Sequence, residues 1–126
     1  MAEDMIPYEH QKASIISINS DNKLATLADT WLHKHYVVFE DIDAPVTYKG
    51  RELLFFNEEQ ARSIIDFVEA IADETDNMFV HCDAGVSRSA AVAKYIADVY
   101  GLHFNDQYSI YNRHVYSTLW KVKNNY

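Results

Sequence analysis

The chain has 126 residues with a formal net charge of −8, and 48% of its residues are hydrophobic. These values suit a single compact domain over residues 1–126 and exclude a disordered chain. An acidic protein is a poor general binder of nucleic acid or anionic membranes, so we expect neither as a partner, and no apolar run is long enough to span a bilayer. The polar N-terminus is unlike a signal peptide and the one cysteine cannot form an internal disulfide, which predicts a cytoplasmic protein.

The first half of the chain alternates short apolar runs with polar segments. Residues 13–18 (ASIISI) predict a strand that is buried on both faces. Residues 19–34 offer several cap candidates followed by apolar residues at helical spacing, which predicts a short helix. Residues 35–40 (HYVVFE) predict a second strand. Residues 41–56 contain a proline and a glycine and keep no regular period, which indicates a long loop of the kind that is often functional.

The second half of the chain has clearer helical periods. Residues 57–74 predict an amphipathic helix that begins with a capping box, with Asn57 as the cap. Residues 77–81 predict a third strand and residues 88–100 a buried helix. Residues 105–123 predict a last helix, whose apolar face consists of Ile110, Tyr111, Val115, Leu119 and Val122. Because strands alternate with helices, we predict an α/β fold with a central, mostly parallel sheet flanked by helices.

The string HCDAGVSRS occupies residues 81–89, between the third predicted strand and the buried helix. In an open α/β sheet, ligands bind at such junctions, outside the carboxyl ends of the strands. A loop that runs into a helix N-terminus directs backbone N–H groups and the positive end of the helix dipole toward one point, which makes an anion site. A glycine within it lets the backbone approach the anion closely. We therefore expect a phosphate-binding loop that consists of Asp83, Ala84, Gly85, Val86, Ser87 and Arg88.

The loop also carries the only thiol of the chain, at Cys82. Backbone N–H groups, a helix N-terminus and a guanidinium all favour the thiolate, which is the reactive form. Arg88 has a rigid fork that matches two phosphate oxygens, and the Ser89 hydroxyl is placed to donate to the sulfur. His81 is expected to lock the loop through hydrogen bonds. This set suits attack of sulfur on phosphorus, with all the positive charge supplied by the loop and no metal or other cofactor needed.

A phosphate monoester also needs a proton donor for its leaving oxygen, and that donor must come from outside the loop. Asp41 and Asp43 follow the second predicted strand, at the start of the long loop. We expect one of them to protonate the leaving oxygen and then to activate the water that hydrolyses a cysteinyl-phosphate. Asp41 is preferred because it directly follows the end of the strand, and Asp43 is the alternative.

The motif Cys-x5-Arg-Ser, preceded by His, resembles the signature of the cysteine-dependent protein tyrosine phosphatases, and HCDAGVSRSAAVA is most similar to their dual-specificity branch. The order of IISI, VVFEDID, a helix, FVHCDAGVSRS, a helix and FNDQYSIYNRHV is similar to that branch over about residues 13–120. In this family the loop cysteine is the nucleophile, the arginine binds phosphate, the hydroxyl residue helps the sulfur leave, and an upstream aspartate is the general acid. The resemblance implies these roles for Cys82, Arg88, Ser89 and Asp41.

The resemblance further implies a phosphorylated protein or peptide as substrate. The chain has no room for the elements that deepen the pocket of the longer tyrosine-specific members, which implies activity on phosphoserine and phosphothreonine beside phosphotyrosine. Lipid-phosphatase relatives carry lysines inside the loop, and this loop has none, which argues against a phosphoinositide substrate. Two alternatives stay open: a phosphoresidue-binding module without catalysis, and an RNA or nucleotide 5′-phosphatase of the same superfamily. An inert buried cysteine would leave the arginine, glycine, serine and histidine at these spacings unexplained. A rhodanese-like site also uses Cys-x5-Arg but lacks an upstream acid loop and the flanking order of this chain.

Overall fold

The computed structural model describes residues 12–20, 24–82, 87–102 and 110–126. Its central sheet has the strand order β2-β1-β5. The three strands are β1 (Ala13–Asn19), β2 (Lys34–Val38) and β5 (Asn77–Cys82). The middle strand pairs with both neighbours in parallel. The prediction of an α/β fold with a parallel sheet is therefore confirmed, and the three predicted strands lie within a residue or two of their expected bounds.

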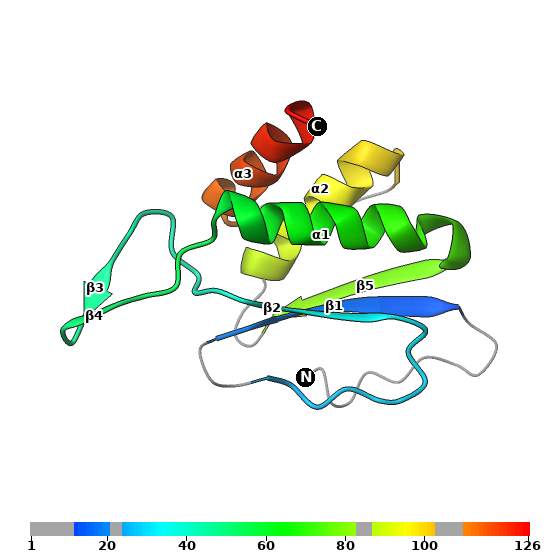
Figure 1. Cartoon of the computed structure of the whole chain (residues 1–126), viewed down its shortest axis with the longest axis horizontal. Helices are drawn as coiled ribbons and strands as arrows, with labels where there is room; N and C mark the ends of the chain where they lie inside the picture. The colour runs from blue at the N-terminus through cyan, green and yellow to red at the C-terminus, as the bar shows by residue number, and fades with distance from the viewer. Residues whose placement is uncertain (1–11, 21–23, 83–86, 103–109) are drawn as a thin grey trace.

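The helices of the described part gather on one face of this sheet (Figure 1). They are α1 (Glu58–Ile71), α2 (Ser87–Tyr100) and α3 (Arg113–Asn124), and a short 3-10 turn, η2 (Ala72–Glu74), extends the first of them. The first helix starts with the predicted capping box, because Asn57 Oδ1 accepts from the Gln60 backbone N–H at 2.8 Å and the Gln60 side chain accepts from the Asn57 backbone N–H at 3.1 Å. The local signals for α1 and α2 thus predicted both helices correctly.

Strand β1 is buried along its whole length, as predicted. Successive side chains of a strand point to opposite faces, so β1 contributes to two apolar clusters. Ile16 and Ile18 pack under the helices, in the larger cluster. Ala13 and Ile15 point to the other face, where the smaller cluster lies. A sheet that is covered on both faces explains why its central strand has no polar alternation.

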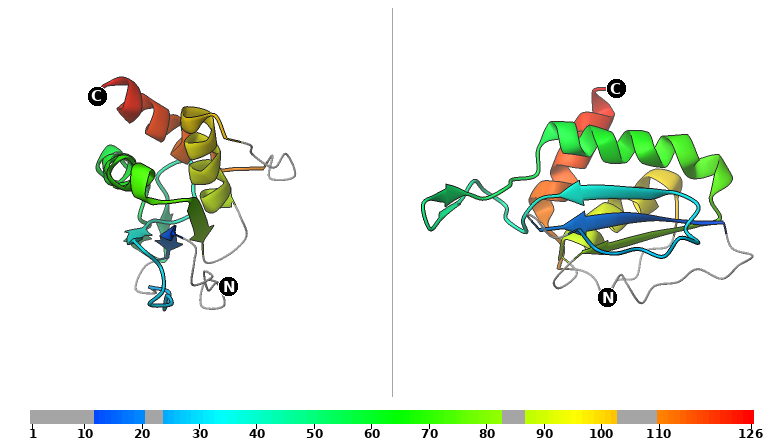
Figure 2. Two further views of the ribbon diagram at one scale, coloured as in Figure 1. Left: turned by 90° about the vertical axis from the view of Figure 1, so that its right-hand side faces the viewer. Right: turned by 60° about the horizontal axis from the view of Figure 1, so that its bottom comes forward.

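The segment that covers the second face differs from the prediction. Residues 24–33 form no helix, although a helix was predicted over 19–34. The segment runs along the face of the sheet opposite the helices (Figure 2). Its Leu32 backbone N–H donates to the Ala13 carbonyl of β1 at 2.8 Å, and Trp31 is only 4% exposed in the smaller cluster. Hydrogen bonds to the strand and burial of the indole outweigh a helix propensity of a few tenths of a kcal/mol per residue, about 0.7 at most.

The long loop predicted over 41–56 contains a small antiparallel hairpin, which the sequence analysis missed. Its strands are β3 (Thr47–Tyr48) and β4 (Arg51–Glu52), and it projects away from the body of the molecule (Figure 1). Lys49 and Gly50 connect the strands with φ of 53° and 75°. Two positive φ values are typical of a type I′ turn, whose twist matches that of the flanking strands.

Helix α3 begins later than predicted. The expected helix covered 105–123, whereas the observed one starts at Arg113 with Asn112 as its N-cap. Ile110, expected on the buried face, precedes the helix and is 83% exposed. Residues 103–109 lie outside the described part of the chain. Tyr111, also expected on that face, precedes the helix as well and is only partly buried. Val115, Leu119 and Val122 are buried as predicted.

All three parallel strands end at the same edge of the sheet. The register pairs Ile18 of β1 with Cys82 of β5 and Asn19 of β1 with Val38 of β2. The thiol and the loop that carries Asp41 are therefore brought to one edge by strand pairing alone. Among the described helices, none is both long and apolar enough to cross a membrane.

Candidate active site

Cys82 is the last residue of β5 and is half-buried. Its thiol donates a hydrogen bond to Ser89 Oγ at 3.4 Å. Ser89 lies in the first turn of α2 and is 8% exposed, so the contact is screened from bulk water. When the sulfur is ionised it can only accept, and the Ser89 hydroxyl then becomes the donor. The structure thus brings together the two residues that the sequence placed on either side of the loop.

Arg88 is the second residue of α2 and is 3% exposed. Its Nη1 donates to the Phe39 carbonyl at 2.7 Å and to the Ser20 hydroxyl at 3.4 Å, so the guanidinium is held at the ends of β1 and β2. Its Nε is buried and has no hydrogen-bond partner in the described part of the chain. A buried charged donor without a partner is costly in a folded protein. Such an atom is typical of a site that binds an anion.

Of the other expected phosphate-binding residues, the structure describes Ser87. Ser87 is the first residue of α2, a helix of 14 residues, so a helix N-terminus does lie at the loop as predicted. Backbone N–H groups at such a terminus attract anions. Asp83, Ala84, Gly85 and Val86 lie outside the described residues.

His81, predicted to support the loop, lies on β5 beside the central strand. Its Nε2 is hydrogen-bonded to the hydroxyl of Ser17, which is fully buried on β1. The bond crosses between paired strands at the residue just before the thiol. It holds the end of β5 in place, which is consistent with a supporting role.

Asp41 follows β2 and points toward the start of α2. Ser87 Oγ donates to Asp41 Oδ1 at 3.1 Å, and Asn112 Nδ2 donates to the same oxygen at 2.9 Å. Asp43 lies two residues further along and makes no hydrogen bond or ion pair within the described part of the chain. Of the two carboxylates proposed as the acid, Asp41 is the one that is tied to the loop.

Asn112 is a site residue that the sequence analysis missed. It is 7% exposed, and besides Asp41 its Nδ2 reaches the Ile42 carbonyl at 3.1 Å. Its backbone N–H donates to the Ser87 carbonyl at 3.0 Å, and its Oδ1 accepts from the Val115 N–H as the cap of α3. The signal was an asparagine three residues before a buried valine, a typical N-cap spacing. Residue 112 was placed inside a helix predicted over 105–123, so Asn112 was not considered as an N-cap.

A pocket of about 460 Å³ opens between these elements. Its volume falls within the range of small-molecule sites, and it lies at the first residue of α2, Ser87. The long loop, the start of α2 and the start of α3 each contribute to its walls. Its lining residues are Asp41, Ile42, Asp43, Val46, Ser87, Tyr111, Asn112 and Arg113.

Comparison with known proteins agrees with this geometry. The model of the family described as "Dual specificity phosphatase, catalytic domain" matches residues 8–119, which is most of the chain. No curated protein and no solved structure matches the chain. The matched span includes both predicted acid residues, the thiol and the loop, and Asn112 at the start of α3.

Proposed function

The chain belongs to the dual specificity phosphatase catalytic domains, a family of cysteine-dependent phosphatases, and from this premise we propose that it hydrolyses phosphate monoesters of proteins or peptides. The observation that carries the proposal is the arrangement around Cys82. The sulfur lies 3.4 Å from Ser89 Oγ, at the start of the helix that also carries the buried Arg88. A phosphate oxygen bound to Arg88 Nε would satisfy its free donor.

In the first step we propose that the Cys82 thiolate attacks phosphorus as the bond to the leaving oxygen breaks. Arg88 binds two of the three equatorial oxygens, whose charge it offsets in the transition state. Asp41 transfers its proton to the leaving oxygen, so an alcohol or phenol departs. Because both hydrogen bonds to Asp41 fall on Oδ1, the other carboxyl oxygen, Oδ2, is the one that carries this proton.

In the second step water attacks phosphorus of the cysteinyl-phosphate, and the sulfur leaves as a thiolate. The Asp41 carboxylate accepts a proton from that water, which returns it to the acid form. The Ser89 hydroxyl donates to the departing sulfur and so stabilises the charge that develops there. The products are inorganic phosphate and the starting enzyme.

The test is hydrolysis of a small aryl phosphate by the wild type and by Cys82→Ser, in the presence of a reductant. We expect the variant to lose turnover to background while it keeps its affinity for phosphate or vanadate, since loss of a nucleophile typically costs about a millionfold in kcat. Turnover that survives in Cys82→Ser would refute the nucleophile assignment. Binding of phosphopeptides without turnover in the wild type would instead support a binding module.

The substrate class is tested with matched peptides that carry phosphotyrosine, phosphoserine or phosphothreonine, together with a nucleotide 5′-phosphate. We propose that all three peptides are substrates and that phosphotyrosine is hydrolysed fastest, because a phenol is the better leaving group. A preference for the nucleotide would favour the RNA or nucleotide phosphatase alternative.

A further inference from the structure

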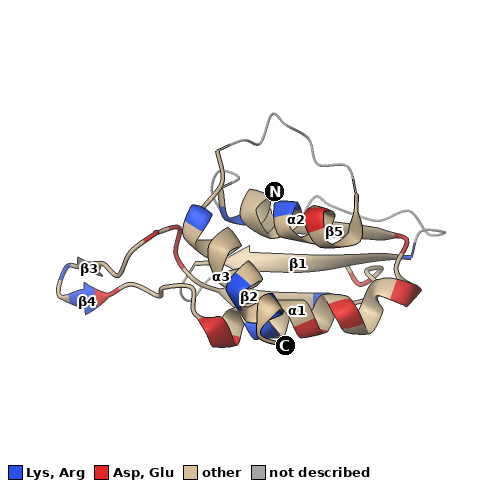
Figure 3. Cartoon of the chain, turned by 90° about the horizontal axis from the view of Figure 1, so that it is seen from above, with Lys and Arg blue, Asp and Glu red and all other residues tan. Residues whose placement is uncertain are grey.

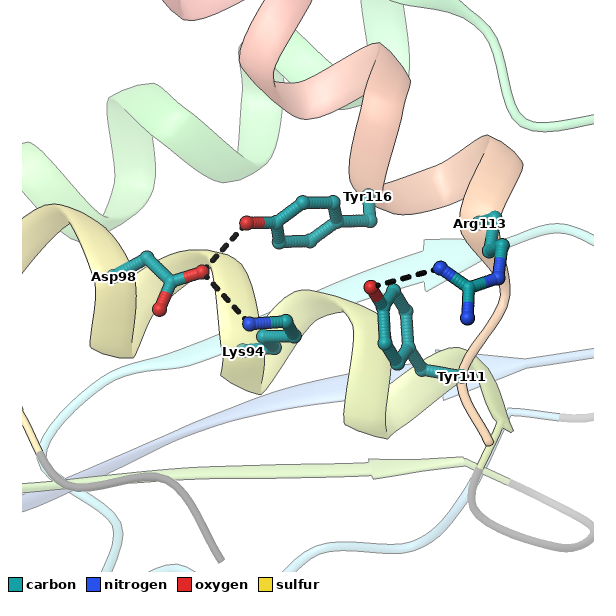
Figure 4. Close-up of polar contacts among 5 residues, drawn as sticks. All are labelled: Lys94, Asp98, Tyr111, Arg113 and Tyr116. Carbon is teal, nitrogen blue, oxygen red and sulfur yellow. Dashed lines mark hydrogen bonds and ion pairs between the residues drawn. The ribbon is translucent and has the colours of Figure 1, made fainter. Parts of the chain in front are cut away.

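Arg113 begins α3 at the wall of the pocket that also contains Asp41. Its side chain is exposed, and its Nη1 donates to the Tyr111 hydroxyl at 3.2 Å, with the guanidinium carbon 4.9 Å from the centre of the Tyr111 ring (Figure 4). Within the described part of the chain the guanidinium has no carboxylate partner. One Nη and one face of the guanidinium are occupied by Tyr111, so the remaining donors are available to a ligand.

Tyr111 is itself held in place by contacts to side chains of α2 and α3 (Figure 4). Its ring packs edge-on against Tyr116 at 5.4 Å, and Lys94 Nζ lies 5.8 Å and 5.2 Å from the centres of the two rings. The Tyr116 hydroxyl donates to Asp98 at 2.6 Å, and Asp98 pairs with Lys94 at 3.1 Å. The hydrogen bond from Tyr116 lowers the pKa of Asp98, and the hydrogen bond to Asp98 raises the pKa of Lys94, so both stay charged at neutral pH.

This arrangement orients Arg113 before any ligand binds. An arginine that is already stacked on a fixed ring loses less conformational entropy when it forms a hydrogen bond than a free one does. The positive charge of Arg113 also differs in sign from the other charges that line the pocket. The lysines of α3 and the acidic residues of α1 are coloured in Figure 3, and two of them pair: Lys121 lies 3.6 Å from Glu58 and Lys123 lies 2.9 Å from Glu69. Arg113 has no such partner within the described part of the chain, and the other charged side chains that line the pocket, Asp41 and Asp43, are both negative.

We propose that Arg113, oriented by Tyr111, binds an anionic side chain next to the phosphorylated residue of a peptide substrate. The ligand is a carboxylate or a second phosphate, which share the geometry that a guanidinium recognises. The inference rests on the proposed function, since it assumes that the phosphorylated residue itself occupies the site at Cys82 and Arg88. Arg113 would then determine which phosphorylated sequences are hydrolysed efficiently.

The experiment compares peptides within each variant. A phosphotyrosine is placed in a neutral alanine-rich host, and glutamate or phosphoserine replaces each flanking alanine in turn. For the wild type we expect at least one position at which the anionic residue raises kcat/KM by about twofold to fivefold, mainly through KM, which is the range of an exposed ion pair. The effect should weaken at high ionic strength. The glutamate and phosphoserine series distinguish the two sources of the negative charge.

The variants identify the residue responsible. In Arg113→Ala the ratio of kcat/KM between the anionic and the neutral peptide should fall to about one, and in Tyr111→Phe, which lacks the hydroxyl acceptor, it should lie in between. Arg62→Ala is the matched control. Arg62 also stacks on a tyrosine, at 5.0 Å from the Tyr126 ring, but it belongs to α1 and does not line the pocket. Because each variant is its own reference, a loss of stability does not alter the ratio.

The inference is overturned if Arg113→Ala keeps the ratio of the wild type, or if Arg62→Ala lowers it equally, which would indicate a general effect of net charge. Failure of the proposed function is separate, because it appears as a wild type that hydrolyses no aryl phosphate. In that case the same peptides are compared by their affinity for the Cys82→Ser protein. A loss of the anionic preference on adding Arg113→Ala to that protein would still support the subsite.

Discussion

Asp41 receives two hydrogen bonds on one carboxyl oxygen, from Ser87 and from Asn112. Two donors on Oδ1 restrict rotation of the carboxyl group and leave the other oxygen to exchange a proton with the substrate. Asp43, two residues further along, has no such partners in the described part of the chain. Both candidates for the general acid are aspartates that line the same pocket. At the scale of single residues they differ because hydrogen bonds orient the carboxyl group of Asp41 and not that of Asp43.

This difference predicts how the two carboxylates respond to substitution. Asp41→Asn should lower kcat for an alkyl phosphate by about a hundredfold to ten-thousandfold, the usual contribution of a general acid, and much less for an aryl phosphate with a good leaving group. Asp43→Asn is the matched control, and the ratio of its kcat to that of the wild type should be the same for every leaving group. The measurement is a series of esters with graded leaving groups. The opposite pattern in the two variants would assign the acid to Asp43.

At the scale of elements, Asn112 links three segments that are far apart in the sequence. It caps α3, bonds the start of α2 through its backbone, and holds the loop after β2 through its side chain. We therefore regard it as a positioning residue that acts through Asp41. Its amide donates to two loop groups and accepts from one helix group, which neither aspartate nor serine can reproduce in full.

Two substitutions separate the cap from the positioning role. Asn112→Ala removes both and should lower the free energy of unfolding by about 1 kcal/mol. Asn112→Ser keeps a cap but is too short to reach Asp41, so stability should be nearly restored. Both should lower kcat for poor leaving groups by about tenfold to a hundredfold, because the acid is less well oriented. If Asn112→Ser restores activity as well as stability, the residue acts only through α3.

Elements also differ in how far local sequence predicts them. Helix α1 was predicted closely because its cap, its acidic first turn and its apolar stripe are all local and agree with one another. The segment at 24–33 has apolar residues at the same helical spacing, yet it forms no helix. Its backbone instead bonds to the first residues of the central strand β1, and its apolar side chains cover the second face. Burial of that face depends on residues that are far apart in the sequence, so the spacing of apolar residues within the segment does not predict it.

At the scale of the whole molecule, His35 joins the sheet to the helical layer. It lies on β2, and its ring stacks on Phe67 of α1 at 4.8 Å between centres, with Nε2 hydrogen-bonded to Ser63 at 3.2 Å. Burial at this junction lowers the pKa of His35 below its usual value of 6.5, because the charged ring would lose its hydration. Protonation of one side chain is thus coupled to the packing of the two layers.

This coupling predicts a contribution to stability that depends on pH. The unfolded chain protonates His35 near pH 6.5, whereas the folded protein resists until a lower pH. Below pH 6.5 the unfolded state therefore binds more protons, so the contribution is fully present above that pH and is lost as the pH falls through the folded pKa. Denaturant unfolding of the wild type and of His35→Phe, at pH 8 and at pH 5, measures it. The wild type should lose more stability than the variant, and an equal loss in both would contradict the assignment.

By itself the sequence determined the parts of the protein that are local in the chain. The α/β class, the three parallel strands, two helices and the contact between Cys82 and Ser89 all follow from residues close together in the sequence, because a strand, a loop and a helix start are set by neighbouring residues. Only the tertiary structure decided which aspartate is tied to the loop, that Asn112 lies beside it, and what covers the second face of the sheet. Those outcomes depend on the pairing of strands that end at one edge and on burial of apolar surface. Strand pairing and burial both bring together residues that are dozens of positions apart, and no local pattern in the sequence predicts such contacts.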